Sequence, residues 1–139
     1  MTVVTKSIEL DSKGENDVVD ITREVQRCLA DSRLGSGVVT VFVAGSTAAV
    51  TTLEFEPGLA KDFPDALERA APKDRAYEHE KTWHDGNGHS HVKSALVGTS
   101  LAIPFVGGRL ALGTWQQIVL AEFDVRPRTR KVVLQIMGE

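Results

Sequence analysis

All four histidines of the chain fall in one short segment, with two acidic residues among them. The histidines are His79, His84, His89 and His91. Neutral imidazole is the commonest protein ligand for zinc, nickel, copper and iron. Glu80 and Asp85 add carboxylate oxygens, which can bind a metal directly or orient an imidazole that does. The segment is therefore either a divalent-metal site or a solvated polar loop whose histidines have no role.

A short turn with hydroxyl side chains, Gly45-Ser46-Thr47-Ala48, follows an apolar run of β-branched residues. Hydroxyl and backbone N–H groups at the end of a strand can hold a phosphate or a carboxylate. Ser46 and Thr47 are therefore candidate substrate-binding residues. The alternative is ordinary turn chemistry, in which serine and threonine hydroxyls bond only their own backbone.

Three arginines alternate with other residues toward the end of the sequence, at Arg126, Arg128 and Arg130. In an extended chain this period of two would direct all three guanidinium groups to one face. Because arginine binds phosphate through paired hydrogen bonds, Arg128 and Arg130 are candidate ligands of a phosphorylated molecule. A solvated strand edge, or pairing with Glu122 or Asp124, is the alternative.

Two further polar residues are candidates for a role in chemistry. Gln116 lies in a long apolar stretch, where a buried amide must bond either a neighbour or a ligand. Glu54 comes shortly after the Ser46-Thr47 turn, and we expect it to return toward the same end of the sheet. There it would act as a general base beside a metal, with Asp85 as the second candidate catalytic carboxylate. The alternative is that Glu54 pairs with a surface lysine or arginine.

The composition restricts the classes to which the protein can belong. The 139 residues are 42% apolar and 25% charged, which suits one folded domain over residues 1–139. The net charge of −3 lacks the positive excess of a general nucleic-acid binder. Cys28 is the only cysteine, the first residues lack a signal-peptide pattern, and no apolar run approaches the roughly 20 residues of a membrane span. We therefore expect a cytoplasmic protein without a nucleic-acid or membrane partner.

Hydrophobic spacing indicates the elements of the first half of the chain. Strands are expected at 3–10 and at 38–43, the latter a continuous apolar run typical of a buried strand. One helix should follow an N-cap at Asp20. A second should cover 59–70 and be kinked or divided by Pro64.

The second half begins with a long polar loop over 72–90, and a short helix is expected at 92–96. The Gly107-Gly108 pair then predicts a hairpin. Its second arm, 109–123, is apolar on both faces and should be one central strand that contains Gln116. With a closing strand at 131–137, the mixed and often antiparallel order predicts an α+β domain.

Taken in order, these pieces resemble the YjbQ-like family, whose members are sometimes described as secondary thiamine-phosphate synthases. The resemblance covers nearly the whole chain, and its most specific part is a Gly-Thr-Trp-Gln strand with an upstream Ser-His pair. The matching stretches are Ser46-Thr47-Ala48 with Glu54, Tyr77-Glu78-His79, Asp85-Gly86-Asn87-Gly88-His89-Ser90-His91, Gly98-Thr99-Ser100, Gly108, Gly113-Thr114-Trp115-Gln116-Gln117-Ile118, Glu122, Arg130 and Gly138-Glu139.

The resemblance implies a distorted β-sandwich or half-barrel of largely antiparallel strands, assembled as a homotrimer. It also implies a site near the subunit boundaries in which histidines hold a divalent metal, either zinc or, with a pyrophosphate substrate, magnesium. Carried over by position, His79 and His91 match typical family histidines and His89 matches part of the family, so these are the three expected metal ligands. Other typical polar positions are matched by Thr47, Glu54, Asn87 and Gln116.

The function implied is a metal-binding homotrimeric enzyme that joins a pyrimidine pyrophosphate to a thiazole phosphate, as a main or a side activity. A metal or cations must stabilise the leaving pyrophosphate, and His79, His91 and Arg130 would contribute to this. Two departures favour other readings, because Gly45 stands where the family usually has histidine and Leu53 where it has asparagine. The alternatives are a non-catalytic trimer that binds a metal or a phosphorylated metabolite, and a metal-dependent phosphoester hydrolase.

Overall fold

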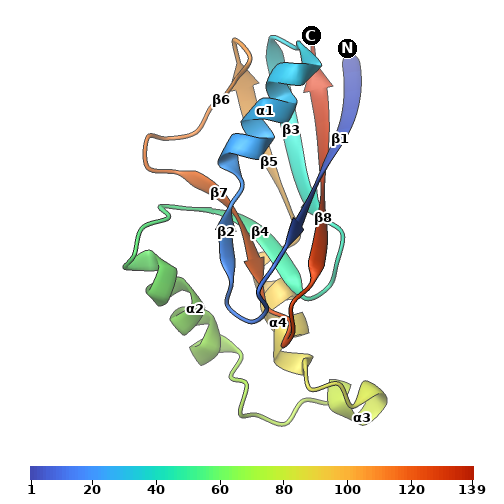
Figure 1. Ribbon diagram of the computed structural model, residues 1–139, viewed down its shortest axis with the longest axis vertical. Helices are drawn as coiled ribbons and strands as arrows, with labels where there is room; N and C mark the ends of the chain where they lie inside the picture. The colour runs from blue at the N-terminus through green and yellow to red at the C-terminus, as the bar shows by residue number, and fades with distance from the viewer.

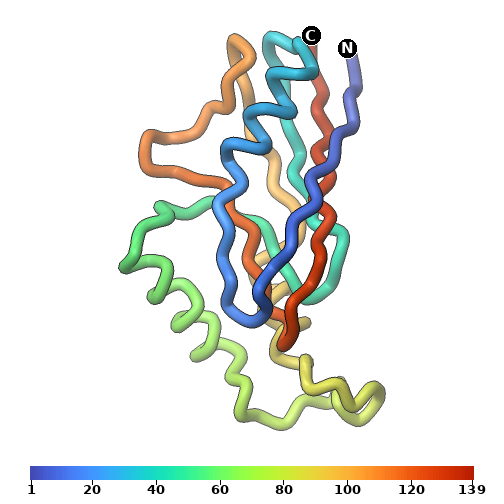
Figure 2. The backbone as a smooth tube through the Cα atoms, in the orientation of Figure 1, coloured from blue at the N-terminus to red at the C-terminus, as the bar shows by residue number.

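Two antiparallel β-sheets make up most of the computed structural model, which describes residues 1–139 (Figures 1 and 2). The larger sheet has the strand order β1-β8-β3-β5-β6, and the smaller has the order β2-β7-β4. The bounds of the larger sheet are β1 Thr2–Asp11, β8 Thr129–Gly138, β3 Ser36–Val43, β5 Ser100–Val106 and β6 Arg109–Leu110. Those of the smaller sheet are β2 Val18–Asp20, β7 Gln117–Glu122 and β4 Ala48–Leu53. The sheets curl into a half-barrel, so the predicted α+β class is confirmed.

Helix α1, Thr22–Ser32, covers the inner face of the curled sheets. It begins one residue later than expected, because its N-cap is Ile21 rather than Asp20. Oδ1 of Asp20 still accepts hydrogen bonds from N and Oγ1 of Thr22, the first residue of the helix. Val25 and Leu29 are spaced by one turn and are fully buried. They pack with the inward side chains of both sheets in one apolar cluster, which is the main core of the protein.

Three helices lie between β4 and β5, at the end of the molecule away from α1 (Figure 1). They are α2 Leu59–Ala70, α3 His79–Trp83 and α4 Gly88–Val97. The stretch 72–90 is therefore not one loop, because it contains α3 and the first turn of α4. Nor does Pro64 divide α2, which continues through it as a single helix. Nearby in space, α4 runs along β4, where Oγ of Ser94 donates a hydrogen bond of 2.6 Å to the carbonyl of Ala48.

The prediction of a single strand over 109–123 is wrong. β6 ends at Leu110 in the larger sheet, and β7 begins at Gln117 in the smaller one. The residues between them cross from one sheet to the other, so Trp115 lies in a loop and is 71% exposed. The expected central strand does exist, but only as β7, which lies between β2 and β4 and is buried along most of its length.

No helix covers the outer face of the larger sheet, and this changes the expected burial of β3 (Figure 1). Val39 and Val41 point inward and are fully buried, whereas Val38 and Phe42 point outward and are each 41% exposed. The strand was predicted correctly, but its burial on both faces was not. A continuous apolar run indicates a strand without showing whether both of its faces are covered.

None of the four helices is both long enough and apolar enough to cross a membrane.

Candidate functional site

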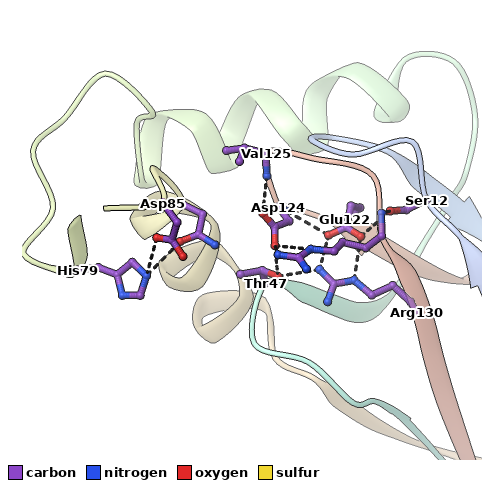
Figure 3. Close-up of polar contacts among 10 residues, drawn as sticks. Ser12, Thr47, His79, Asp85, Glu122, Asp124, Val125 and Arg130 are labelled. Carbon is purple, nitrogen blue, oxygen red and sulfur yellow. Dashed lines mark hydrogen bonds and ion pairs between the residues drawn. The ribbon is translucent and has the colours of Figure 1, made fainter. Parts of the chain in front are cut away.

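The segment from α3 to the start of α4 brings together His79, Glu80 and Asp85. His79 and Glu80 begin α3, which ends at Trp83, and the next residue, His84, has a left-handed conformation with φ of 56°. Gly86, with φ of 70°, continues the reversal, and such angles are easily adopted only by glycine. The chain therefore turns back on itself, and Asp85 faces His79 across the turn (Figure 3).

Hydrogen bonds fix the side chains of this group. Nε2 of His79 lies 3.0 Å from Oδ1 of Asn87 and 3.3 Å from Oδ1 of Asp85. Oε1 of Glu80 accepts a 2.7 Å hydrogen bond from the backbone N–H of Gly88, the first residue of α4. This bond places a carboxylate at the positive end of the α4 dipole. Oε2 of Glu80 makes no hydrogen bond and is free to bind a ligand.

Two of the expected metal ligands, His79 and His91, lie side by side, with ring centroids 4.4 Å apart. The third, His89, is not part of this group. Its side chain is 2% exposed, and its Nε2 lies 2.6 Å from Oε1 of Glu15 in the turn between β1 and β2. The alternation His89-x-His91 would put both rings on one face only in an extended chain, and here the residues lie in α4.

Glu15 connects His89 to Lys73, because its Oε2 lies 2.8 Å from Nζ of Lys73. Burial alone would raise the pKa of Glu15. The hydrogen bonds from Lys73 and His89 outweigh burial and hold the pKa of this carboxyl below its ordinary value. These two contacts of Glu15 tie the β1–β2 turn to the segment after α2 and to α4.

Sequence reasoning missed Lys93, a buried cation in α4. Its side chain is 1% exposed, and its Nζ lies 2.6 Å from Oε2 of Glu68 in α2. The hydrogen bond from Lys93 is the main reason that the pKa of Glu68 lies below its ordinary value. A lysine in a polar, charge-rich segment is typical of a solvated surface, and no sequence signal marked this one as buried.

A second polar cluster lies where β7 and β8 meet the turn before β4 (Figure 3). Glu122 is fully buried and accepts hydrogen bonds from Nε and Nη2 of Arg130, while Oγ of Ser12 donates to it at 2.6 Å. Nη2 of Arg130 also donates to Oγ1 of Thr47 at 2.7 Å. The structure therefore brings together Thr47 and Arg130 from the predicted substrate-binding set. Ser12 was missed, because nothing in its sequence surroundings marks it.

Asp124 and Arg128 complete this cluster, with Nη2 of Arg128 2.7 Å from Oδ2 of Asp124. Burial would raise the pKa of Asp124, but hydrogen bonds from Thr47 and Arg128 hold it below its ordinary value. The arginines therefore pair with the carboxylates, as the alternative had it. Arg126 lies in a bend before β8, so the three arginines do not form one extended row.

Glu54 and Gln116 lie away from both clusters. Glu54 follows the last residue of β4, whereas Thr47 precedes its first. Seven residues of extended chain separate them by about 23 Å, so the expected return of Glu54 to the Ser46-Thr47 end is wrong. Gln116 bonds its neighbours, donating to Oγ1 of Thr52 and accepting from N of Gly113, each at 3.0 Å. It lines a separate cavity of about 240 Å³ between β4 and β5.

Comparison with known proteins identifies the family. The model of the UPF0047 protein YjbQ-like family matches residues 6–139. The chain belongs to the YjbQ-like UPF0047 family. It is 39% identical to a UPF0047 protein of Archaeoglobus fulgidus, over 87% of this chain and 91% of that one. It is 36% identical to the UPF0047 protein YugU of Bacillus subtilis, over 96% and 98% of the two chains.

Solved structures of YjbQ-like proteins have the same fold. A YbjQ-like protein of Sulfolobus solfataricus superposes with a TM-score of 0.93 at 32% identity and covers 99% of both chains. A protein of Aeropyrum pernix superposes with a TM-score of 0.90 at 35% identity, covering 98% of this chain and 99% of that one.

Membership of the YjbQ-like family does not carry the activity that the resemblance implied. The relatives are described only as UPF0047 proteins, and the Sulfolobus structure as that of a protein of unknown function. The expected metal-binding enzyme that joins a pyrimidine pyrophosphate to a thiazole phosphate is therefore wrong as a function for this chain.

Proposed function

We propose that this protein binds one divalent cation, and that His79, Glu80 and Asp85 hold it. The observation that carries the proposal is the proximity of three ligand types. One imidazole nitrogen and one oxygen from each carboxylate all lie within 4.8 Å of one another. The proposal concerns binding alone, and it rests on this geometry rather than on the family.

The distances suit zinc. Two ligands of a tetrahedral zinc site are about 3.4 Å apart, given metal–ligand distances of about 2.0–2.2 Å. Nε2 of His79 and Oδ1 of Asp85 are 3.3 Å apart, so a zinc ion fits between them with little movement. Glu80 would contribute Oε2, since Oε1 is held by Gly88. Magnesium prefers oxygen ligands alone, so a set containing His79 favours zinc.

His91 is the candidate for a fourth ligand. Its ring lies against that of His79, and it belongs to the first turns of α4. Imidazole binds a metal only when it is neutral, so zinc affinity should weaken in mild acid.

Zinc titration of the metal-free protein by calorimetry tests the proposal. We expect one zinc per chain, and we expect H79A and D85N each to weaken binding by about 10-fold or more, because each removes a direct ligand. The matched control is H84N, since His84 is exposed, lies outside the cluster and has a left-handed backbone that asparagine tolerates. Wild-type affinity in H79A and D85N would contradict the proposal.

We also propose that the protein assembles with itself as a homotrimer, through the uncovered outer face of the larger sheet. Strand register aligns an apolar row across β1, β8, β3 and β5. The row consists of Val3, Met137, Val38 and Pro104. The two following rows on this face are also uncharged: Thr5, Gln135, Thr40 and Ala102, then Ser7, Val133, Phe42 and Ser100. A broad face without charges and with exposed apolar side chains is typical of an interface core.

Sedimentation velocity at micromolar concentration tests the assembly. We expect a mass near three times the 15.1 kDa of one chain. T40K places a charge in the middle of the uncharged rows and should shift the protein to monomers, because a buried unpaired charge is costly. E9Q, on the same face but beyond these rows, is the control. A wild-type protein that sediments as a monomer would show that this face stays free.

A further inference from the structure

Hydrogen-bond donors without an acceptor in the protein gather at the turn between β3 and β4, and one of them belongs to Arg130 of β8, which lies beneath this turn. The Arg130 side chain is only 8% exposed, and its Nε and Nη2 are bonded to Glu122 and Thr47. Its Nη1 has no hydrogen-bond partner. Among side-chain nitrogen and oxygen atoms, only Glu24 Oε2 and Ser90 Oγ are both without a hydrogen-bond partner and inaccessible to solvent. Because Nη1 has no partner and is not one of these two atoms, it is accessible to solvent.

Gly45 creates the opening through which Nη1 reaches the surface. A Cβ atom at this position would lie 2.7 Å from Nη1, which is closer than real Cβ contacts. Glycine therefore leaves room for the guanidinium directly beneath the turn. Three bonds to Glu122 and Thr47 hold the arginine there, so it could not move aside freely for a larger residue.

The two residues that follow add further donors. The backbone N–H groups of Ser46 and Thr47 have no hydrogen-bond partner in the protein, and neither does the hydroxyl of Ser46. Ser46 is exposed, whereas Thr47 is buried. Free amides of a turn beside a guanidinium are a recurring arrangement for binding oxyanions.

We propose that the Gly45–Thr47 turn and Nη1 of Arg130 bind the phosphate group of a small phosphorylated molecule. The three terminal oxygens of a phosphate monoester can accept bonds from Nη1, the two amides and the Ser46 hydroxyl together. A carboxylate presents two oxygens in one plane, whereas the terminal oxygens of a phosphate spread in three dimensions and match donors that converge from different directions. Arg130 and Arg128 are already neutralised by Glu122 and Asp124. Affinity therefore comes from hydrogen bonds rather than from excess positive charge, and Arg128 does not contact the ligand.

The probe is inorganic phosphate, added to metal-free protein and followed by amide NMR. We expect saturable shifts of the Ser46 and Thr47 amide resonances. S46D should weaken phosphate binding by about 10-fold or more, because it puts a negative charge at the site. S46N, which is neutral and nearly equal in size to S46D, should weaken phosphate binding less than S46D, because it lacks the negative charge. Since Ser46 is exposed and its side chain unbonded, both variants should fold normally.

A second pair of variants tests the opening itself. G45A should weaken phosphate binding, because its Cβ would displace Nη1. G113A is the control, since a Cβ there would meet only ordinary contacts of 3.6 and 3.7 Å. Equal phosphate affinity in wild type, S46D and G45A would overturn the proposal, as would equal shifts with acetate. Phosphate binding seen only after zinc is added would also overturn it, because the phosphate would then bind the zinc ion and not the turn. If zinc binds but phosphate does not, the phosphate proposal is wrong and the zinc proposal is supported.

Discussion

Replacing Glu122 with glutamine is expected to lower the free energy of unfolding by about 3–5 kcal/mol, the range for breaking a buried ion pair by removing one partner. The Glu122 carboxylate is fully buried and accepts from Arg130, from Oγ of Ser12 and from the backbone N–H of Asp124. Glutamine keeps the shape but turns an NH₂ group toward donors. The Arg130 charge would then remain in the interior without its partner.

Urea denaturation at neutral pH measures this loss, with D65N as the matched control. Asp65 also pairs with an arginine, Arg69, but both side chains are well exposed, at 67% and 72%. Exposed pairs contribute about 0–1 kcal/mol, so D65N should change stability little. Similar unfolding curves for E122Q and D65N would show that the Glu122–Arg130 pair contributes little to the free energy of unfolding.

E68Q is expected to be the second most damaging change, lowering the free energy of unfolding by about 2–3 kcal/mol. Lys93 is 1% exposed, and Glu68 is its only charged partner. Without the carboxylate the Lys93 ammonium remains buried and uncompensated. The loss is smaller than for E122Q, because the Glu68 side chain is 43% exposed and water can partly replace it.

The control for E68Q is E78Q, which removes an exposed pairing with Lys81. The double variant with K93M should recover most of the loss, because it removes the stranded charge and keeps the side-chain volume. If E68Q unfolds at the same urea concentration as E78Q, the Lys93 ammonium does not depend on Glu68 for its stabilisation and the prediction is wrong.

The dependence of the free energy of unfolding on acidic pH is an independent measurement of these ion pairs. The pKa values of Glu15 and Glu68 lie below their ordinary value of 4.5. A carboxyl with a lowered pKa contributes stability that is present above the unfolded-state value and is lost as pH falls through the folded-state pKa. Wild type should therefore lose stability below about pH 4.5, and E68Q should show a shallower loss because Glu68 no longer contributes to it.

The fold was largely predictable because it depends on local spacing. The strand at 3–10, the helix after Asp20 and the hairpin at Gly107-Gly108 each follow from residues close together in the chain. The error at 109–123 arose because an apolar run does not show where a chain leaves one sheet for another. Likewise, the burial of Val38 depends on whether anything covers the sheet.

In the candidate site, too, groupings of residues close in the sequence were predictable and pairings between distant residues were not. His79, Glu80 and Asp85 are neighbours in the chain, so their clustering was visible in the sequence. His89 was misplaced because its partner, Glu15, lies in a turn 74 residues away and meets α4 only in the folded structure. The burial of Lys93 by α2 and α4 has the same origin. Such pairings depend on tertiary contacts that no spacing rule encodes.

The position of β8 in the larger sheet has a consequence for the order of folding. This strand comes last in the chain, yet it lies between β1 and β3 and bonds to both. During synthesis β1 and β3 emerge early but share no partner until β8 is made. The larger sheet must therefore form late, with pairings as distant as Thr2 with Gly138, and distant pairings slow folding. Until then β1 and the edge of β3 that faces away from β5 stay unpaired, which is when the nascent chain is most prone to aggregate.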